Sequence, residues 1–346
     1  MNDFKNSYEE CRKNFLSLTI GASVENLNVP SLQDDDLFID VAYFPSLSDK
    51  KDNLIIITSG VHGIEGFIGS AMQAQFLRSS LFQERDSSLS FLLIHGINPY
   101  GFKHKRRVTE NNVDLNRNFD MDSKIFSNLN PSYQKIYKLL NPEKDSNRLV
   151  FFLKTLKAIA EHSMESLRRG MLSGQYEFPR GIFFGGQKFE PQKEILENTF
   201  LKYSEGYKKI LLIDIHTGYG KKGHLHLLTN GPSPSVAKIF QNEEIDSGDK
   251  EDFYKVTGGF VDFCEKLLSP RLTGVYFEFG TLDSHKTLGS IEAAYRMIRE
   301  NFLFHYRKHL SMKEFEEMFY PNSLEWREKS SKNFMALMKR AINGFL

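Results

Sequence analysis

The chain has 346 residues, of which 40% are hydrophobic and 26% are charged, an ordinary composition for a globular protein. Its 45 lysine and arginine residues nearly balance its 44 aspartate and glutamate residues, so no overall charge would draw it to nucleic acid or to an anionic membrane. The length suits one large α/β domain or two smaller ones, and we expect a single domain because no Pro/Gly/Ser-rich linker divides the sequence.

The N-terminal sequence MNDFKNSYEECRKNF carries mixed charge and no apolar core segment, so it does not resemble a secretory signal. No apolar run approaches the roughly 20 residues needed to span a bilayer. Two cysteines, Cys11 and Cys264, are too few for a disulfide framework and lack a metal-binding spacing. The sequence therefore predicts a cytoplasmic protein with reduced thiols and no membrane or nucleic-acid partner, and it gives no indication of the oligomeric state.

Apolar runs typical of buried strands alternate with helical patterns along the chain. In chain order, the expected elements are a helix at 1–20, strands at 37–44 and 53–60, a helix at 69–82, a strand at 90–97, a helix at 147–172, strands at 209–218, 224–230 and 274–280, and helices at 290–309 and about 311–346. The last segment is charged, and we expect it to be an addition on the surface of the same domain. This alternation predicts an α/β protein with a mostly parallel sheet covered by helices on both faces.

Residues able to do chemistry follow the ends of these strands. His62 and Glu65 follow the strand at 53–60, Asn98 follows the next strand, and His216 and Glu278 lie near the ends of two later strands. Ligands usually bind at the carboxyl ends of parallel strands. We therefore expect one site at that edge of the sheet.

The segment LIIITSGVHGIEGFIGS (54–70) has a glycine at every third position after a strand, which suits either a phosphate-binding loop or a metal site. No Walker sequence is present, and a dinucleotide loop would need an acidic residue at the end of the next strand, where this chain has His95 and Gly96. His62 and Glu65 stand three residues apart on one tight turn. They can point at the same metal ion.

His216, in LLIDIHTGYG, offers a third ligand of a suitable type. Taken alone, a histidine at a strand end is more often a packing or capping residue. Together with His62 and Glu65 it completes the two nitrogens and one carboxylate that are typical of catalytic zinc, with one position left for water. Zinc lowers the pKa of such a water to roughly 7.

The segment at 95–120 is rich in planar donors. The basic run at 103–105 is best explained as a solvated surface, whereas the Asn116–Arg117 pair offers the donors that hold a carboxylate. A separate arginine could stabilise the oxyanion that forms when a carbonyl is attacked. Glu278 interrupts the apolar strand in GVYFEFGT, where a carboxylate is costly unless it has a partner or a task.

The motifs HGIEG, NPYG, RR, DLNRNF, DIHTG and FEFGT, in this order, resemble the zinc carboxypeptidase (M14) superfamily, and most closely its branch of bacterial proteins with the domain of unknown function DUF2817. The resemblance spans about residues 40–305, and NNVDLNRNF is more specific than any single ligand pair. The aspartoacylase and succinylglutamate desuccinylase branch is also similar in its ligand order and its DLNR phrase. The fold implied is a mixed eight-stranded sheet sandwiched by helices.

This resemblance implies a role for each matching residue. His62, Glu65 and His216 would bind one zinc ion per chain. Glu278 would be the general base that deprotonates zinc-bound water and then passes the proton to the leaving amine.

The resemblance also implies how the substrate would be held. Arg107 would polarise the scissile carbonyl, with the adjacent Arg106 as the alternative, and Asn116 and Arg117 would bind the free carboxylate of the substrate. Classical carboxypeptidases also have a mobile tyrosine over the substrate. Tyr254 is the nearest candidate by order, although a simple loop aromatic is the preferred interpretation.

The sequence predicts a zinc-dependent hydrolase that cleaves an amide or peptide bond next to a free carboxylate. An N-acyl amino acid deacylase is the alternative, with the same metal and Glu278 but a pocket closed by the 173–190 loop. A metal-binding or peptide-binding protein without turnover is a third possibility, which Glu278 argues against because binding needs no general base. His224 and His226 alternate on one strand and could bind a second ion, but ordinary strand packing is the simpler interpretation.

Overall fold

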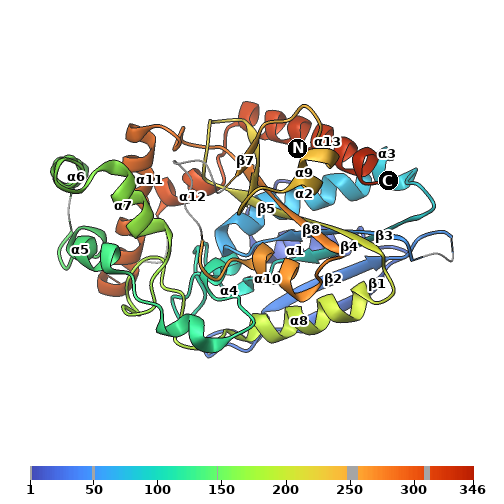
Figure 1. Cartoon of the computed structure of the whole chain (residues 1–346), viewed down its shortest axis with the longest axis horizontal. Helices are drawn as coiled ribbons and strands as arrows, with labels where there is room; N and C mark the ends of the chain where they lie inside the picture. Colours follow the sequence, from blue (N-terminus) through green and yellow to red (C-terminus); the bar gives the residue numbers. More distant parts are fainter. Residues whose placement is uncertain (1, 49–50, 146, 248–255, 308–311) are drawn as a thin grey trace.

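The structure is a computed structural model that describes residues 2–48, 51–145, 147–247, 256–307 and 312–346. Its centre is an eight-stranded sheet with the strand order β1-β2-β4-β3-β5-β8-β6-β7 (Figure 1). The strands are β1 (Ser23–Asn28), β2 (Phe38–Phe44), β3 (Asn53–Ser59), β4 (Leu89–His95), β5 (Lys209–Thr217), β6 (Leu225–Thr229), β7 (Ile245–Ser247) and β8 (Leu272–Phe279).

Helices surround this sheet and connect most of its strands (Figure 1). They are α1 (Tyr8–Leu16), α2 (Gly66–Arg78), α3 (Ser80–Gln83), α4 (Pro99–Lys103), α5 (Pro131–Leu140), α6 (Arg148–His162), α7 (Met164–Leu172), α8 (Pro191–Ser204), α9 (Pro234–Ile239), α10 (Phe260–Leu267), α11 (Thr287–Phe302), α12 (Lys313–Phe319) and α13 (Leu324–Phe345). The 3-10 helices are η1 (Gly63–Glu65), η2 (Leu115–Arg117) and η3 (Ser123–Ser127), and a π-helical turn, η4 (Leu303–Arg307), follows α11.

The centre of the sheet is parallel and its outer strands add antiparallel pairs. β4, β3, β5 and β8 run parallel to their neighbours in this group, whereas β2 pairs antiparallel with β1 and β4, and β6 antiparallel with β8. The register sets Ser59 opposite Ile215 and His216 opposite Glu278. The carboxyl ends of β3, β5 and β8 therefore meet at one edge, as the sequence predicted.

Alternate residues of the strands pack into separate cores on the two faces of the sheet. On one face Ile55, Ile57 and Phe277 pack in a cluster with residues of α2 and α13, and on the other Leu54 and Ile56 pack with residues of α8 and α10. Successive side chains of a strand point to opposite faces, so a continuously apolar strand needs both faces covered. The predicted mixed, mostly parallel eight-stranded sheet with helices on both faces is confirmed.

Two helical predictions need correction. The helix expected at 147–172 is two helices, because Ser163 between α6 and α7 has a φ of 64°, which no continuous α-helix contains. The C-terminal segment is helical, but Phe334 and Met338 of α13 are fully buried in the main core. Thus α13 covers the sheet and is not a surface addition.

Two strands at the margins of the sheet, β1 and β7, were not predicted. Both are short, and neither contains a buried residue, so they lack the apolar runs by which buried strands are predicted. None of the helices in the described part of the chain combines the length and apolar character that crossing a bilayer demands.

Candidate active site

The first two predicted ligands lie on the turn that joins β3 to α2. The chain leaves β3 at Ser59 and forms η1, so that His62 and Glu65 end up on the inner side of the turn. Gly63 is required here because a Cβ on it would lie 2.1 Å from the carbonyl carbon of Gly101. This close approach lets the amide of Gly63 donate to the carbonyl oxygen of Arg107 at 3.1 Å. Gly63 thus lets the turn with His62 and Glu65 pack against the segment that contains Arg107.

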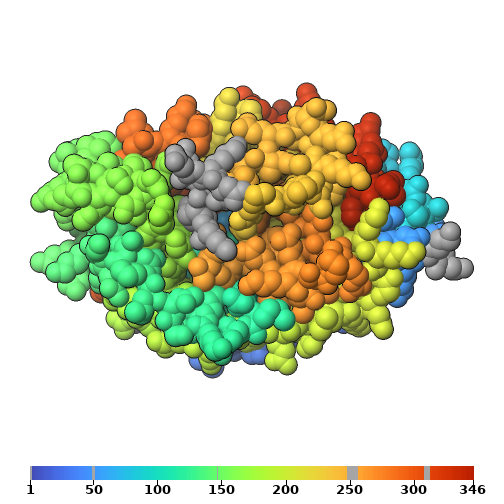
Figure 2. Space-filling model, in the orientation of Figure 1, coloured from blue at the N-terminus to red at the C-terminus, as the bar shows by residue number. Residues whose placement is uncertain are grey.

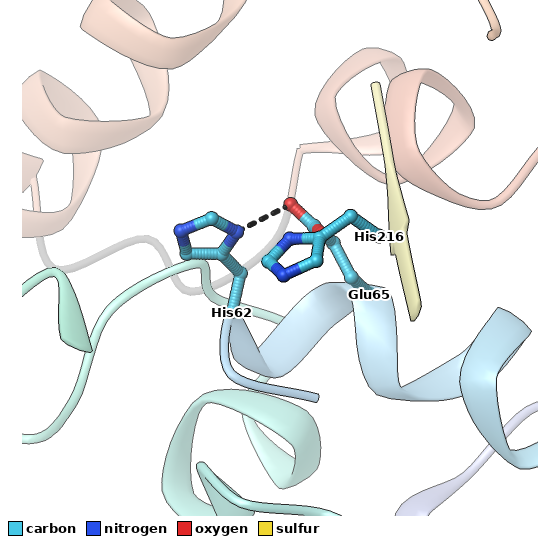
Figure 3. A group of neighbouring side chains, drawn as sticks. All are labelled: His62, Glu65 and His216. Carbon is cyan, nitrogen blue, oxygen red and sulfur yellow. Dashed lines mark hydrogen bonds and ion pairs between the residues drawn. The ribbon is translucent and has the colours of Figure 1, made fainter. Parts of the chain in front are cut away.

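His62, Glu65 and His216 converge, with one ligand atom from each lying within 4.8 Å of the others (Figure 3). The Nδ1 atoms of both histidines face the carboxylate of Glu65, at 2.8 Å for His62 and 2.9 Å for His216. All three side chains are buried. The structure therefore brings together the three predicted ligands, and two imidazole nitrogens with one carboxylate fit the donor set of a catalytic zinc site.

Behind the histidines lie two buried aspartates that the sequence analysis did not assign to the site. Asp214 Oδ2 lies 2.6 Å from His216 Nε2, and Thr58 donates to the other oxygen of Asp214 at 2.7 Å. Such an arrangement fixes the proton on Nε2 and leaves Nδ1 to bind a metal. The signal was present in DIHTG, because Asp214 and His216 are two residues apart on a strand and so share a face.

Asp114 plays the corresponding part next to His62. Its Oδ1 lies 3.1 Å from His62 Nε2, and its Oδ2 accepts from Arg107 Nε at 3.2 Å. Asp114 is therefore shared between the histidine and the arginine. Arg107 Nη2 also lies 2.6 Å from His62 Nε2, and because arginine can only donate, that imidazole nitrogen can donate to Asp114 or accept from Arg107 but not both. Asp114 is the first residue of DLNR, the motif that also contains the predicted site residues Asn116 and Arg117.

The ligand cluster, formed by the predicted ligands His62, Glu65 and His216, is strongly polarised. Burial alone would raise the pKa of Glu65, but the charges of His62 and His216 outweigh it and lower that pKa below its ordinary value. Burial alone would lower the pKa of His216, but the charges of Asp214 and Glu65 raise it well above its ordinary value. Buried carboxylates around two imidazoles therefore favour a positive charge at this point, which a divalent cation would supply.

Glu278 lies at the end of β8 beside these ligands and lines the same cavity. One of its oxygens accepts from the backbone amide of Tyr219 at 2.8 Å. Burial, together with the negative charge of Glu65, raises the pKa of Glu278 to about 8. A carboxyl group in such surroundings can exchange a proton near neutral pH.

The two consecutive arginines point to different parts of the molecule. Arg107 lines the cavity, where its Nη1 lies 3.1 Å from Glu65 Oε1. Arg106 is fully buried elsewhere, with Nε 2.7 Å from Glu300 Oε1 and its guanidinium stacked over the ring of Phe304. The structure therefore places Arg107, and not Arg106, beside the ligand cluster.

Asn116 and Arg117 of η2 also line the cavity. Arg117 donates from Nε and Nη2 to the carbonyl oxygen of Leu172, at 3.1 and 2.5 Å, and from Nη1 to that of Asn116 at 2.8 Å. A guanidinium has five N–H donors, so within the described ranges one on Nη1 and one on Nη2 have no acceptor. Asn116 is fixed by its own Oδ1, which accepts from the backbone amide of Phe260 at 2.9 Å.

All seven predicted site residues border one cavity of about 190 Å³. Much of the rest of its wall is apolar and was not predicted, because it comes from α7, α11 and α12 and from the 173–190 loop: Met171, Leu172, Phe183, Ala294, Met297 and Phe319. Three other residues were considered for the site. Tyr254, the candidate for a tyrosine over the substrate, lies outside the described residues. His224 and His226, the candidates for a second ion, are not among the residues that line the cavity. Their rings are 6.1 Å apart, and His226 Nε2 accepts from the backbone amide of Lys221.

Two solved structures illustrate the similarity of the fold. Carboxypeptidase A from Helicoverpa armigera is 14% identical, with a TM-score of 0.51 over 97% of this chain and 73% of that chain. Thrombin activatable fibrinolysis inhibitor is 12% identical, with a TM-score of 0.54 over 98% of this chain and 74% of that chain. At these identities the likeness establishes the fold alone.

Sequence comparison identifies the family. No curated protein matches this chain in sequence. The model of a protein family described as "Protein of unknown function (DUF2817)" matches residues 4–333, which is nearly the whole chain and confirms the resemblance found in the motifs. The chain belongs to the DUF2817 family, and its fold is that of carboxypeptidase A.

Proposed function

We propose that this chain is a zinc-dependent hydrolase that cleaves an amide bond next to a free carboxylate, in the manner of a carboxypeptidase. The observation that carries the proposal is the convergence of His62, Glu65 and His216 within 4.8 Å, with Glu278 bordering the same cavity. The fold shared with carboxypeptidase A supports it. A peptide with a free carboxyl end is the substrate that this arrangement suits best.

His62, Glu65 and His216 would hold one zinc ion, which when bound supplies a Lewis acid for the carbonyl oxygen and makes water more acidic. Glu278 accepts the proton of the attacking water and delivers it to the nitrogen of the leaving amine. Arg107 stands beside Glu65, where an N–H can donate to the carbonyl oxygen as that oxygen becomes negative.

The substrate's carboxylate is assigned to Arg117. Among the described residues, two of its N–H donors, one on each Nη, are left after the bonds to Leu172 and Asn116, and they can pair with the oxygens of a carboxylate. The carbonyl of Leu172 holds the guanidinium in place before a substrate arrives. The amide of Asn116, anchored by Phe260, lies next to it.

An N-acyl amino acid deacylase is the second candidate and would use the same residues. One observation favours it: Phe183, from the 173–190 loop, forms part of the cavity wall. A phenylalanine there would limit the size of the acyl group that the site accepts. The two candidates share the metal, the base and the carboxylate-binding arginine, and they differ only in what stands on the other side of the scissile bond.

The test is hydrolysis of dipeptides and N-acetyl amino acids by the zinc-loaded chain and its Glu278→Gln variant. Glutamine keeps the shape of the side chain but cannot act as a base, so turnover should fall by a factor on the order of 100 or more while zinc remains bound. Glu328→Gln, at an exposed position of α13, is the control and should keep full turnover. Unchanged turnover in Glu278→Gln would show that this residue takes no part in the mechanism. A wild-type chain that cleaves neither dipeptides nor N-acetyl amino acids would contradict the proposal of a hydrolase.

A further inference from the structure

Arg168 of α7 borders the same cavity but has no part in the proposed mechanism. Its Nη2 donates to Ser290 Oγ at 2.8 Å, and this hydroxyl is its hydrogen-bond partner within the described ranges. Arg107 contacts two carboxylates, and Arg117 contacts two backbone carbonyls. Among these arginines of the cavity wall, Arg168 is therefore the one whose guanidinium faces only a hydroxyl in the described part of the chain.

A chain of hydrogen bonds fixes Arg168 relative to the catalytic edge of the sheet. Ser290 Oγ, which accepts from Arg168, donates to the carbonyl oxygen of Ser284. Ser284 Oγ in turn donates to the carbonyl oxygen of Gly218 at 3.0 Å. Gly218 follows β5, which carries the ligand His216. The guanidinium is thus connected through hydrogen bonds to the residue that follows β5, two positions after the predicted ligand His216.

Helix α7 also connects Arg168 to the proposed carboxylate site. Leu172, whose carbonyl accepts from Arg117, lies four residues after Arg168 and so on the same side of the helix. The space-filling view shows the green helices α5, α6 and α7 at one end of the molecule (Figure 2). This end of the molecule therefore supplies both the support for Arg117 and a third arginine of the cavity wall, in addition to Arg107 and Arg117.

The surroundings of Arg168 favour a carboxylate over an apolar partner. Met171, Ala294 and Met297 contribute apolar surface to this wall. A substrate side chain that fills the cavity removes water from the guanidinium, which is costly unless the incoming group pairs with it. A carboxylate pairs with it in surroundings of low dielectric, where the attraction is strong.

We propose that Arg168 is a specificity-determining residue that binds a second carboxylate of the substrate, so that the amino acid held at Arg117 is acidic. The placement of the first carboxylate rests on the proposed function. The ligand is a dicarboxylic amino acid joined through its α-nitrogen to an acyl group. Either a peptide that ends in glutamate or aspartate, or a small N-acyl derivative of these amino acids, presents this chemistry.

The experiment measures binding by calorimetry, in zinc-loaded chain that carries Glu278→Gln to prevent turnover. Glycyl-glutamate should bind at least about tenfold more tightly than glycyl-glutamine, because one charge-assisted pair is lost with the amide. Arg168→Met should abolish this preference, since methionine keeps the apolar stem and removes the charge. The matched control is Arg169→Met, because the neighbouring Arg169 is exposed and paired with Glu165 on the outer surface, and it should retain the preference.

Equal affinity for the two dipeptides, or a preference that survives Arg168→Met, would overturn the proposal. Hydrolysis of glycyl-glutamate and of N-acetyl-glutamate by the unsubstituted enzyme, measured in parallel, separates this outcome from a failure of the proposed function. A binding preference that depends on Arg168 supports the assignment even where hydrolysis is absent. Cleavage of one substrate and not the other identifies the peptide or the small acyl derivative as the source of the ligand.

Discussion

Asp214 Oδ2 lies 2.6 Å from His216 Nε2, on the side of the imidazole away from the other two predicted ligands. Both residues belong to β5 and point to the same face, and Thr58 of β3 donates to the second carboxylate oxygen at 2.7 Å. The aspartate therefore has both oxygens engaged inside the molecule. We assign it the task of orienting His216 for a metal ion.

Replacing Asp214 by Asn should weaken zinc binding without removing a ligand. An amide is a poorer acceptor for the Nε2 proton than a carboxylate. Loss of such a supporting carboxylate typically weakens metal binding on the order of 10- to 100-fold, and we expect a loss of zinc affinity of this size. Competition with a chelator measures the dissociation constant. Asp246→Asn is the control, because Asp246 lies beside His226 and is not among the residues that line the cavity. Equal zinc affinity in both variants would show that Asp214 does not support the metal site.

Gly63→Ala should destabilise the fold and disturb the metal site together. The new Cβ would lie 2.1 Å from a backbone carbon of Gly101, and backbone cannot rotate away as a side chain can. Overpacking of this kind costs on the order of 1–3 kcal/mol, which thermal unfolding would detect as a lower Tm. Gly231→Ala is the matched control, because a Cβ there meets nothing within 4 Å. A Gly63→Ala variant as stable as the control would contradict the close approach.

The carboxylate role of Arg117 predicts how a blocked substrate behaves. Converting the free carboxylate to an amide removes a charge-assisted hydrogen bond, so kcat/KM should fall roughly 10- to 100-fold. In Arg117→Ala most of this difference should vanish, because the group that binds the carboxylate is gone, and Arg117→Lys should restore little of the activity, because an ammonium cannot reproduce the planar fork. If Arg117→Ala instead loses the same factor on free and blocked substrates, Arg117 is a structural arginine held by Leu172 and does not bind the carboxylate.

Acid stability should depend on the buried Asp40. Burial alone would raise its pKa, but the neighbouring His95 and Arg12 lower it below the ordinary value, with Arg12 Nε 2.8 Å from Asp40 Oδ2. A depressed pKa contributes stability at pH values above the ordinary pKa of the group, and this contribution is lost as the pH falls through the folded-state pKa.

The free energy of unfolding of Asp40→Asn should therefore be lower than that of the wild type at pH 7, and the difference should shrink as the pH falls below about 4. Denaturant titrations at several pH values measure it. The exposed Asp35→Asn provides the control and should show almost no difference at any pH. A gap between Asp40→Asn and wild type that stays constant down to low pH would contradict the linkage.

Those parts of the fold and site that depend on local pattern could be predicted from the sequence. Continuous apolar runs identified β2 to β6 and β8, and the turn after β3 placed His62 and Glu65 together within a few residues. Glu278 stood out because it interrupts an apolar strand. Each of these signals lies within a single short segment.

The rest depends on how distant segments dock, which local pattern does not encode. Arg168 and Phe183 reach the cavity from an α-helix and a loop whose position is set by packing against α11, and neither has a distinctive neighbourhood in the sequence. Helix α13 was wrongly predicted to lie on the surface, because many of its residues are polar although one face, which includes Phe334 and Met338, is apolar and buried. The strand β1 was missed because it is exposed and has no apolar run.

The zinc content of purified protein tests the central claim most directly. After incubation with zinc and removal of the excess, elemental analysis of the wild type should give about one zinc per chain, and His62→Ala and His216→Ala should each lose most of it, because removal of one of three ligands leaves an incomplete site. His224→Ala, at a position that does not line the cavity, should keep the wild-type content. Full zinc occupancy in both His62→Ala and His216→Ala would contradict the account.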